Sequence, residues 1–163
     1  MSLQASKFCV SAFTAAAFAI MLSGSAARAA DNFDHLKGNW SGGGNITLAN
    51  GEKERIRCRA TYIPVASNVK ITLRCASDSY KFELASDISY EGGKISGSWN
   101  ETSRGVVGSL TGKATATNIS ATAQAIGFTA DLSIRASGNS LAVSIRSPGS
   151  EISEVAISMS RGR

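Results

Sequence analysis

The stretch HLKGNWSGGGNITLANGEKERIRC, residues 35–58, has the pattern of two β-strands joined by a tight turn. Alternate positions in its first half place these residues on one face: Trp40, Gly42, Gly44, Ile46 and Leu48. The Asn50-Gly51 dipeptide that follows is typical of a two-residue hairpin turn. Glycine inside a strand weakens it, but allows a sharp bend or the close approach of another backbone. The glycines therefore predict a first strand that curls strongly.

A period of two continues almost to the C-terminus. The further segments with this alternation are 54–62, 69–75, 80–84, 94–101, 107–114, 118–125, 127–135, 140–146 and 154–160. Short turn signals separate them: Ser77-Asp78, Gly92-Gly93, Ser137-Gly138-Asn139 and Pro148-Gly149. After the first thirty residues no segment shows a helical period over helix length, and only residues 31–38 suit a short helical turn. The sequence predicts an all-β fold.

Consecutive short hairpins predict an antiparallel up-and-down barrel of 8–10 strands. A chain built this way must protect the edges of its sheet, and closure into a barrel removes them. A β-sandwich is the alternative, but it leaves edges exposed, and the even spacing of the hairpins favours a barrel. No internal repeat or linker is visible, so residues 30–163 are predicted to form one domain.

The N-terminal 29 residues have the pattern of a cleaved signal peptide. Lys7 precedes an uncharged apolar stretch, residues 8–22, and Ala27 and Ala29 occupy the small positions of a cleavage site. The apolar stretch is shorter than the roughly 20 residues that span a bilayer. We expect export to the periplasm or beyond, with no transmembrane segment after removal of the leader.

The charge of the mature chain is modest. The 17 basic residues include Lys7 and Arg28 of the leader, which leaves 15 against 12 acidic residues, a net charge of about +3. This balance does not argue for nucleic acid as a partner.

The mature chain is predicted to contain one disulfide, between Cys58 and Cys75. Cys9 leaves with the leader, and two cysteines in an exported protein pair by default. A two-residue turn at Ala66-Ser67 places the two directly opposite each other in one hairpin, within bridging distance. A metal site would need more ligands than these cysteines and one histidine provide, so none is predicted.

The same hairpin places cations on the outer face of the predicted sheet. Arg59 falls opposite Arg74, and a two-residue turn at Ser77-Asp78 would place Lys81 opposite Arg74. Arg55 and Arg57 lie on the same side of their strand. Opposed like charges destabilise a sheet by up to about 1 kcal/mol. The face is either ordinary solvated surface, neutralised in part by nearby glutamates, or a site for an anionic envelope component.

The inner face mixes large aromatic residues with small ones. Ala121, Ala123, Ala125 and several glycines either leave a ligand cavity or make room for aromatics from the opposite wall. The sequence slightly favours a filled or nearly filled core.

Gly38-Asn39-Trp40, at the start of the first predicted strand, resembles the G-x-W motif that opens lipocalins and other calycin barrels. In lipocalins this tryptophan packs across the closed end of the barrel against an arginine from near the C-terminus. The resemblance implies that Trp40 closes one end of this barrel and that Arg161 is its partner.

The wider sequence LKGNWSGGG is similar to the opening of the bacterial nitrobindin-like haem barrels, which bind haem iron through a late histidine. His35, before the first strand, is the single histidine here, so no cofactor is expected. Metalloprotease-inhibitor barrels of bacterial periplasms also share an early G-x-W and a single disulfide.

Three classes of function follow. The chain is predicted to be a non-catalytic periplasmic binding protein for an apolar small molecule or an anionic envelope partner. The alternative is a protein-interaction module such as a protease inhibitor, which would insert a loop or the segment before Trp40 into its target. An enzyme is not expected, because His35 has no evident nucleophile partner and no serine lies in a nucleophile elbow. A pocket of roughly 300 Å³ or more would favour small-molecule binding.

Overall fold

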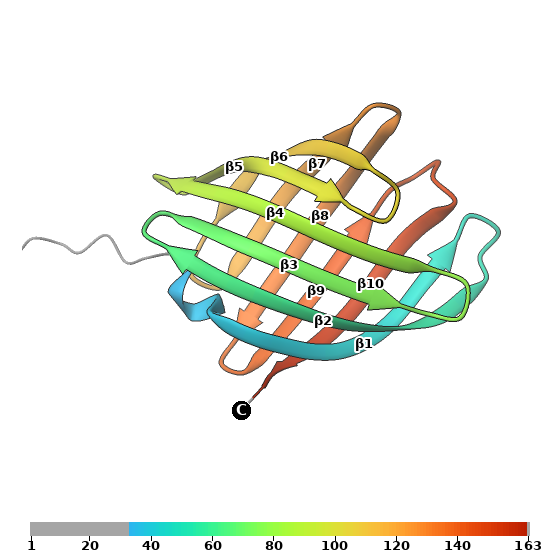
Figure 1. Ribbon diagram of the computed structural model, residues 1–163, viewed down its shortest axis with the longest axis horizontal. Coiled ribbons are helices and arrows are strands. Elements are labelled where there is room, and N and C mark those ends of the chain that lie inside the picture. The colour runs from blue at the N-terminus through green and yellow to red at the C-terminus, as the bar shows by residue number, and fades with distance from the viewer. Residues whose placement is uncertain (1–32, 163) are drawn as a thin grey trace, which may run out of the picture.

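Ten strands follow one another along the chain and close into an antiparallel barrel (Figure 1). The computed structural model describes residues 33–162. A short 3₁₀ turn, η1 (Asp34–Leu36), precedes the strands: β1 (Gly38–Leu48), β2 (Lys53–Val65), β3 (Asn68–Ala76), β4 (Lys81–Glu91), β5 (Lys94–Glu101), β6 (Val106–Ala114), β7 (Asn118–Ala125), β8 (Phe128–Ser137), β9 (Ser140–Arg146) and β10 (Ile152–Arg161). The predicted signal peptide, residues 1–29, lies outside the described residues.

Closure is made by the first and last strands. β1 pairs with β10 from Trp40 opposite Arg161 to Leu48 opposite Ile152, and every other strand pairs with its sequence neighbours. The prediction of an up-and-down barrel of 8–10 strands is therefore confirmed, and a sandwich is excluded.

The glycines of β1 allow β10 to approach closely. A Cβ atom on Gly42 would overlap the carbonyl oxygen of Ser158, and one on Gly44 would overlap that of Ala156. Figure 1 shows β1 curving along the lower edge of the barrel to meet β10. The predicted curl of the first strand thus serves closure, because a side chain at either position would force the two backbones apart.

The two ends of the barrel differ. At one end, Phe33, which precedes η1, and Leu36 of η1 are buried against the core together with Trp40. The opposite end, called here the open end, carries the five loops that follow the odd-numbered strands: residues 49–52, 77–80, 102–105, 126–127 and 147–151.

One predicted register is wrong. The β3–β4 connection contains four residues, Ser77–Tyr80, rather than two, and the Ser77 amide donates to the Tyr80 carbonyl at 2.9 Å. Arg74 consequently faces Glu83, and Lys81 faces Ala76. The longer turn places an acidic residue where the sequence predicted a third cation.

Candidate functional site

The barrel interior contains a cavity of about 460 Å³. Its walls are mainly aliphatic and aromatic, and the aromatic side chains that line it are Phe33, Tyr62, Phe82, Trp99 and Phe128. The slight preference for a filled core was therefore wrong.

The position of Trp99 explains why the aromatics do not fill the interior. Trp99 faces Gly108 across the β5–β6 pair, and a Cβ at Gly108 would lie 2.6 Å from the indole ring. The indole Nε1 donates to the carbonyl of Ser109 at 3.0 Å. Phe128 meets the ring edge-on, with centroids 5.8 Å apart. Trp99 thus lies against its own wall, and space remains in front of Ala123 and Ala130 on β7 and β8.

Burial also keeps the interior uncharged at Tyr62. The side chain is 5% exposed and lines the cavity, and desolvation raises the pKa of the phenol to about 12. The phenol is therefore neutral across the physiological range.

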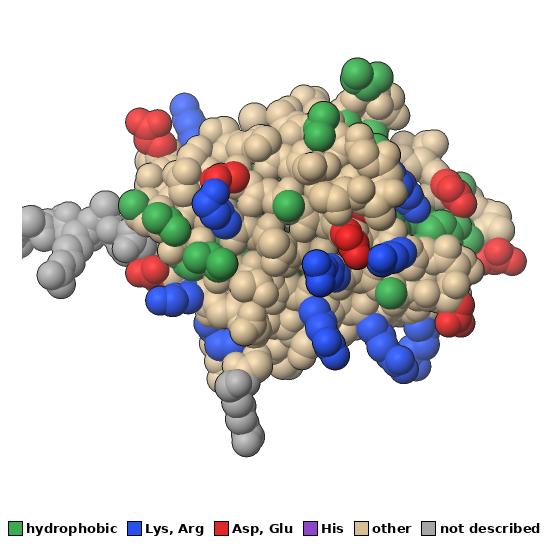
Figure 2. Space-filling view, in the orientation of Figure 1, with side chains coloured by type: hydrophobic (Ala, Val, Ile, Leu, Met, Phe, Trp, Pro, Cys, Tyr) green, Lys and Arg blue, Asp and Glu red, His purple; other side chains and the backbone are tan. Residues whose placement is uncertain are grey.

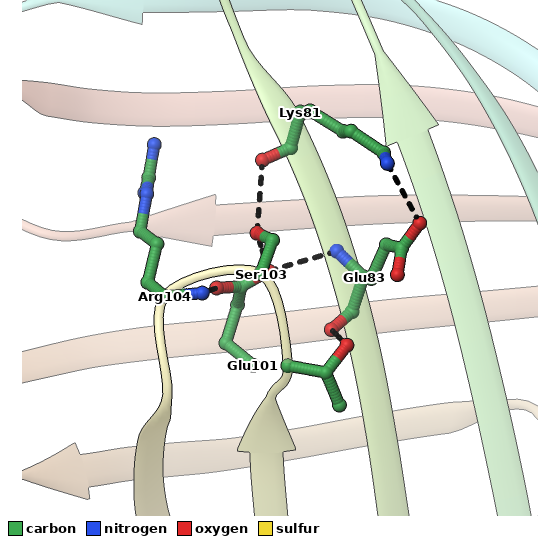
Figure 3. A network of polar contacts seen from close by, with 6 residues as sticks. Lys81, Glu83, Glu101, Ser103 and Arg104 are labelled. Carbon is green, nitrogen blue, oxygen red and sulfur yellow. Dashed lines mark hydrogen bonds and ion pairs between the residues drawn. The ribbon is translucent and has the colours of Figure 1, made fainter.

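The charged groups of the cavity lie at its open end. The β5–β6 loop is fixed there by the buried carboxylate of Glu101 (Figure 3). Its Oε1 accepts from the Glu83 amide at 2.8 Å and the Ser103 hydroxyl at 2.5 Å, and its Oε2 accepts from the Arg104 amide at 2.8 Å. Burial alone would raise the pKa of Glu101, but these hydrogen bonds outweigh it and hold the pKa below its usual range. The carboxylate is thus ionised at neutral pH and joins the loop to β4.

Arg104 extends from this loop over an aromatic ring. Its guanidinium carbon lies 5.1 Å from the ring centroid of Phe82, and Tyr80 stacks nearly parallel to Phe82. The Tyr80 hydroxyl donates to Glu151 at 2.8 Å, which raises the pKa of the phenol. The cavity is lined at its open end by two charged side chains, Arg104 and Glu151, and by the ring of Phe82 beneath Arg104. These charged residues, with Glu101, are called here the rim of the cavity.

The basic face is the outer surface formed by Arg55, Arg57, Arg59, Arg74 and Lys81. The three β2 arginines are exposed, and Arg74 is exposed directly opposite Arg59. Figure 2 shows Lys and Arg side chains gathered over the region where Figure 1 places β2 and β3. A shallow groove runs beside Arg55 and Arg57, and its other walls come from residues 42–45 and 76–78. The sequence thus predicted these arginines to share one surface, and the structure brings them together.

Charge compensation on the basic face is partial. Lys81 forms an ion pair with Glu83 at 3.0 Å, and the hydrogen bond and charge of Lys81, with a smaller contribution from Arg74, lower the pKa of Glu83. Among residues 33–162, neither Arg59 nor Arg74 forms an ion pair, and the same holds for the other two arginines of the face.

The predicted disulfide is present. Cys58 and Cys75 are opposite residues of the β2–β3 hairpin, with their Cα atoms 4.1 Å apart, and both are buried. The two-residue turn at Ala66-Ser67 sets this register.

Trp40 and Arg161 meet at the closed end. Trp40 is 1% exposed, and the guanidinium carbon of Arg161 lies 4.4 Å from its ring centroid. The indole Nε1 donates to the Leu36 carbonyl at 2.8 Å. Arg161 also donates to the carbonyls of His35 and Lys37, so it joins η1 to the end of β10.

The part of the chain that the structure describes contains no group of three or more His, Cys, Asp or Glu side chains placed to hold a metal ion. It also contains no helix long and apolar enough to cross a membrane.

Comparison with known structures supports the fold. The chain superimposes on Rv2717c from M. tuberculosis with a TM-score of 0.63 and 15% identity, over 80% of this chain and 95% of that one. It superimposes on the S-type phycobiliprotein lyase CPES from Guillardia theta with a TM-score of 0.57 and 12% identity, over 80% and 90% of the two chains. No protein-family model matches the chain, and no curated protein matches it significantly. The likeness to these structures thus extends to the fold, an antiparallel barrel.

Sequence reasoning missed the polar rim of the cavity. Glu101 and Arg104 belong to the β5–β6 hairpin and Glu151 to the β9–β10 hairpin, and the tertiary fold brings these two connections to one cavity. Loop positions carry no alternation, so the periodicity that found the strands gave no signal for them.

Proposed function

We propose that this chain is a binding protein that holds an apolar small molecule in the barrel. The observation that carries the proposal is the apolar cavity of about 460 Å³, a volume in the range typical of small-molecule sites. Burial of an apolar ligand there is favourable by roughly 25 cal/mol per Å² removed from water.

The proposed role is carriage without catalysis, in the periplasm. The leader sequence motivates export, and a disulfide suits an oxidising compartment. One structural neighbour is named a lyase, so chemistry on a bound ligand is a further outcome to be tested. The alternative of a protease inhibitor stays a prediction.

Binding of a fluorescent apolar probe, N-phenyl-1-naphthylamine, tests the cavity. Ala123→Phe should fill space at the β7 wall and weaken probe binding at least about tenfold. Gln124→Phe, the exposed neighbouring position, is the matched control and should bind like wild type. Absence of probe binding by wild type, or equal binding by both variants, would contradict the proposal. Mass spectrometry of a ligand recovered from the protein tests the carrier role separately. An unchanged ligand is expected, and a chemically altered ligand would contradict carriage without catalysis.

A second candidate function is association of the basic face with anionic lipid headgroups. Four exposed arginines, none in an ion pair among the described residues, and an adjacent polar groove support it. Guanidinium groups bind phosphate bidentately, and an anion would relieve the repulsion between Arg59 and Arg74.

Cosedimentation with anionic and neutral vesicles tests this candidate. Wild type should bind anionic vesicles and dissociate as salt is raised, because the Debye length is about 10 Å at 0.1 M salt. Arg59→Ser/Arg74→Ser should lose binding, whereas Lys113→Ser/Arg135→Ser, with the same loss of charge elsewhere on the barrel, should retain it. If both double variants lost vesicle binding equally, net charge alone would explain the binding, and the basic face would not be a specific site.

A further inference from the structure

We propose that the ligand of the cavity is an amphiphile with an apolar body and a carboxylate-type anionic head, and that Arg104 selects this head at the open end. The inference rests on the proposed function, because it requires the cavity to be a binding site. It adds the charge of the ligand and the residue that recognises it.

The distribution of polar groups sets the orientation of the ligand. The deep walls, contributed by residues such as Ile88, Leu110 and Val143, are apolar, whereas charged groups line the cavity only around Glu101, Arg104 and Glu151 at the open end. An apolar chain is stable in the deep part, while a charged head is stable only where it meets polar partners or water. The head therefore lies at the open end.

The β5–β6 loop holds Arg104 in place before any ligand arrives. Its amide is fixed to the buried Glu101 carboxylate, and the Thr102 amide donates to the Glu83 carbonyl at 2.8 Å. Figure 3 shows the Arg104 side chain extending away from that carboxylate. The hydrogen bonds hold the backbone of Arg104, and its exposed guanidinium lies against Phe82, so binding a ligand requires less ordering of the loop.

The buried Glu101 carboxylate is already engaged, whereas the side-chain donors of Arg104 are not. Glu101 accepts three hydrogen bonds, and Glu151 accepts one from Tyr80. Within residues 33–162, the Arg104 guanidinium has no ion-pair partner and no side-chain hydrogen bond. Its planar set of donors fits a carboxylate bidentately. A cationic head attracted by Glu101 and Glu151 is the competing arrangement, and the experiment includes it.

Three ligands that differ only in their head test the inference: decanoate, decan-1-ol and decylamine, at pH 7.5. Affinities are measured by displacement of N-phenyl-1-naphthylamine. Decanoate should bind about tenfold or more tightly than decan-1-ol, because charge-assisted hydrogen bonds are roughly twice as strong as neutral ones. Decylamine should bind most weakly.

Arg104→Gln should abolish the preference for decanoate and leave the affinity for decan-1-ol unchanged. Arg146→Gln is the matched control: it removes an exposed arginine at the same end that does not line the cavity, and it should retain the preference.

The outcomes separate the two proposals. If no ligand binds, the proposed function fails and the inference fails with it. If all three bind but equally, or decylamine binds most tightly, the cavity is a binding site and selection of an anion is overturned. If Arg104→Gln keeps the decanoate preference, Arg104 is not the selecting residue.

Discussion

Trp40 and its contacts close one end of the barrel. The indole is buried, donates its N–H to the Leu36 carbonyl and stacks against Arg161, which itself donates to two carbonyls of the η1 region. One aromatic side chain thus links the start of β1, the turn before it and the end of β10. Because the indole N–H has a hydrogen-bond acceptor, burial of the ring leaves no unpaired donor.

Trp40→Ala should lower the free energy of unfolding by about 3–5 kcal/mol, the range for emptying a buried aromatic site. Urea unfolding followed by circular dichroism measures this. Ile63→Ala, at an exposed position of β2, serves as control and should change stability by about 0.5 kcal/mol or less. A Trp40→Ala midpoint equal to that of wild type would mean that the closed end does not depend on this side chain.

Two elements are fixed by connections between neighbouring strands. The β2–β3 hairpin is joined by the Cys58–Cys75 disulfide, and the β5–β6 loop is joined to β4 through Glu101. The first is covalent and independent of pH. The connection through Glu101 depends on the ionisation of a carboxylate, so we expect acid to weaken the attachment of the loop that carries Arg104.

The disulfide predicts that purified, non-reduced protein has no reactive thiol after denaturation. Bridging residues 17 apart stabilises the fold by about 3 kcal/mol in the chain-entropy model, so Cys58→Ser/Cys75→Ser should unfold at lower urea. Thiol titration in denaturant provides the direct measurement. Two reactive thiols per chain would refute the bridge.

Glu101 predicts a loss of stability in acid. Its pKa in the folded state lies below the ordinary value, so the carboxylate stabilises the fold above the unfolded pKa of about 4.3, and this stabilisation disappears as pH falls through the folded pKa. Glu101→Gln should be less stable at pH 7 by about 1–3 kcal/mol, because partly buried donors lose a charged acceptor. The difference from wild type should shrink by pH 3.

Urea unfolding of both proteins at pH 7 and pH 3 measures this effect. Glu91→Gln, at an exposed position at the end of β4, is the control and should track wild type at both values. A constant difference between wild type and Glu101→Gln would show that ionisation is not what stabilises the loop.

At the scale of the whole molecule, closure of the barrel has two consequences, one for the edges of the sheet and one for the loops at its open end. The β1–β10 pairing leaves no free edge among the ten strands, and the same closure brings five loops around one opening. The interior is therefore enclosed by a continuous sheet, and the charged residues of the cavity lie among the loops of the open end.

Amide hydrogen exchange should show the β1–β10 pair as protected as the β6–β7 pair, because both are paired on each side within a closed sheet. Protection factors for Gly43–Asn45 and Thr111–Lys113 provide the comparison. Exchange more than about tenfold faster at β1 would show that the barrel opens locally at this pair of strands.

The sequence by itself determined the order of the strands, the β2–β3 register and the disulfide, but it predicted the fourth strand only over residues 80–84, whereas β4 extends to Glu91. Alternation of apolar residues specifies which face of a strand is buried, and a tight turn at Ala66-Ser67 sets the partner of each residue in its hairpin. These relations are local, so the prediction of the Cys58–Cys75 bridge and of the opposed Arg59 and Arg74 needed no knowledge of the rest of the fold. The same reasoning failed at Ser77–Tyr80, where hydrogen bonds within a four-residue turn, rather than its Ser-Asp signal, decided the register of β4.

The tertiary structure decided the cavity and its rim. Whether aromatic side chains fill a barrel depends on where each ring lies, and Trp99 lies against Gly108 instead of crossing the interior. The residues of the rim come from loops far apart in the sequence, and they meet because ten strands close on themselves. The periodicity of the sequence predicts which residues are neighbours along a strand and across a hairpin. The size of a cavity depends on side chains from all the strands at once, so periodicity does not predict it. For that reason strand periodicity could not indicate Arg104 as a site residue, and the closed barrel decides its position at the cavity.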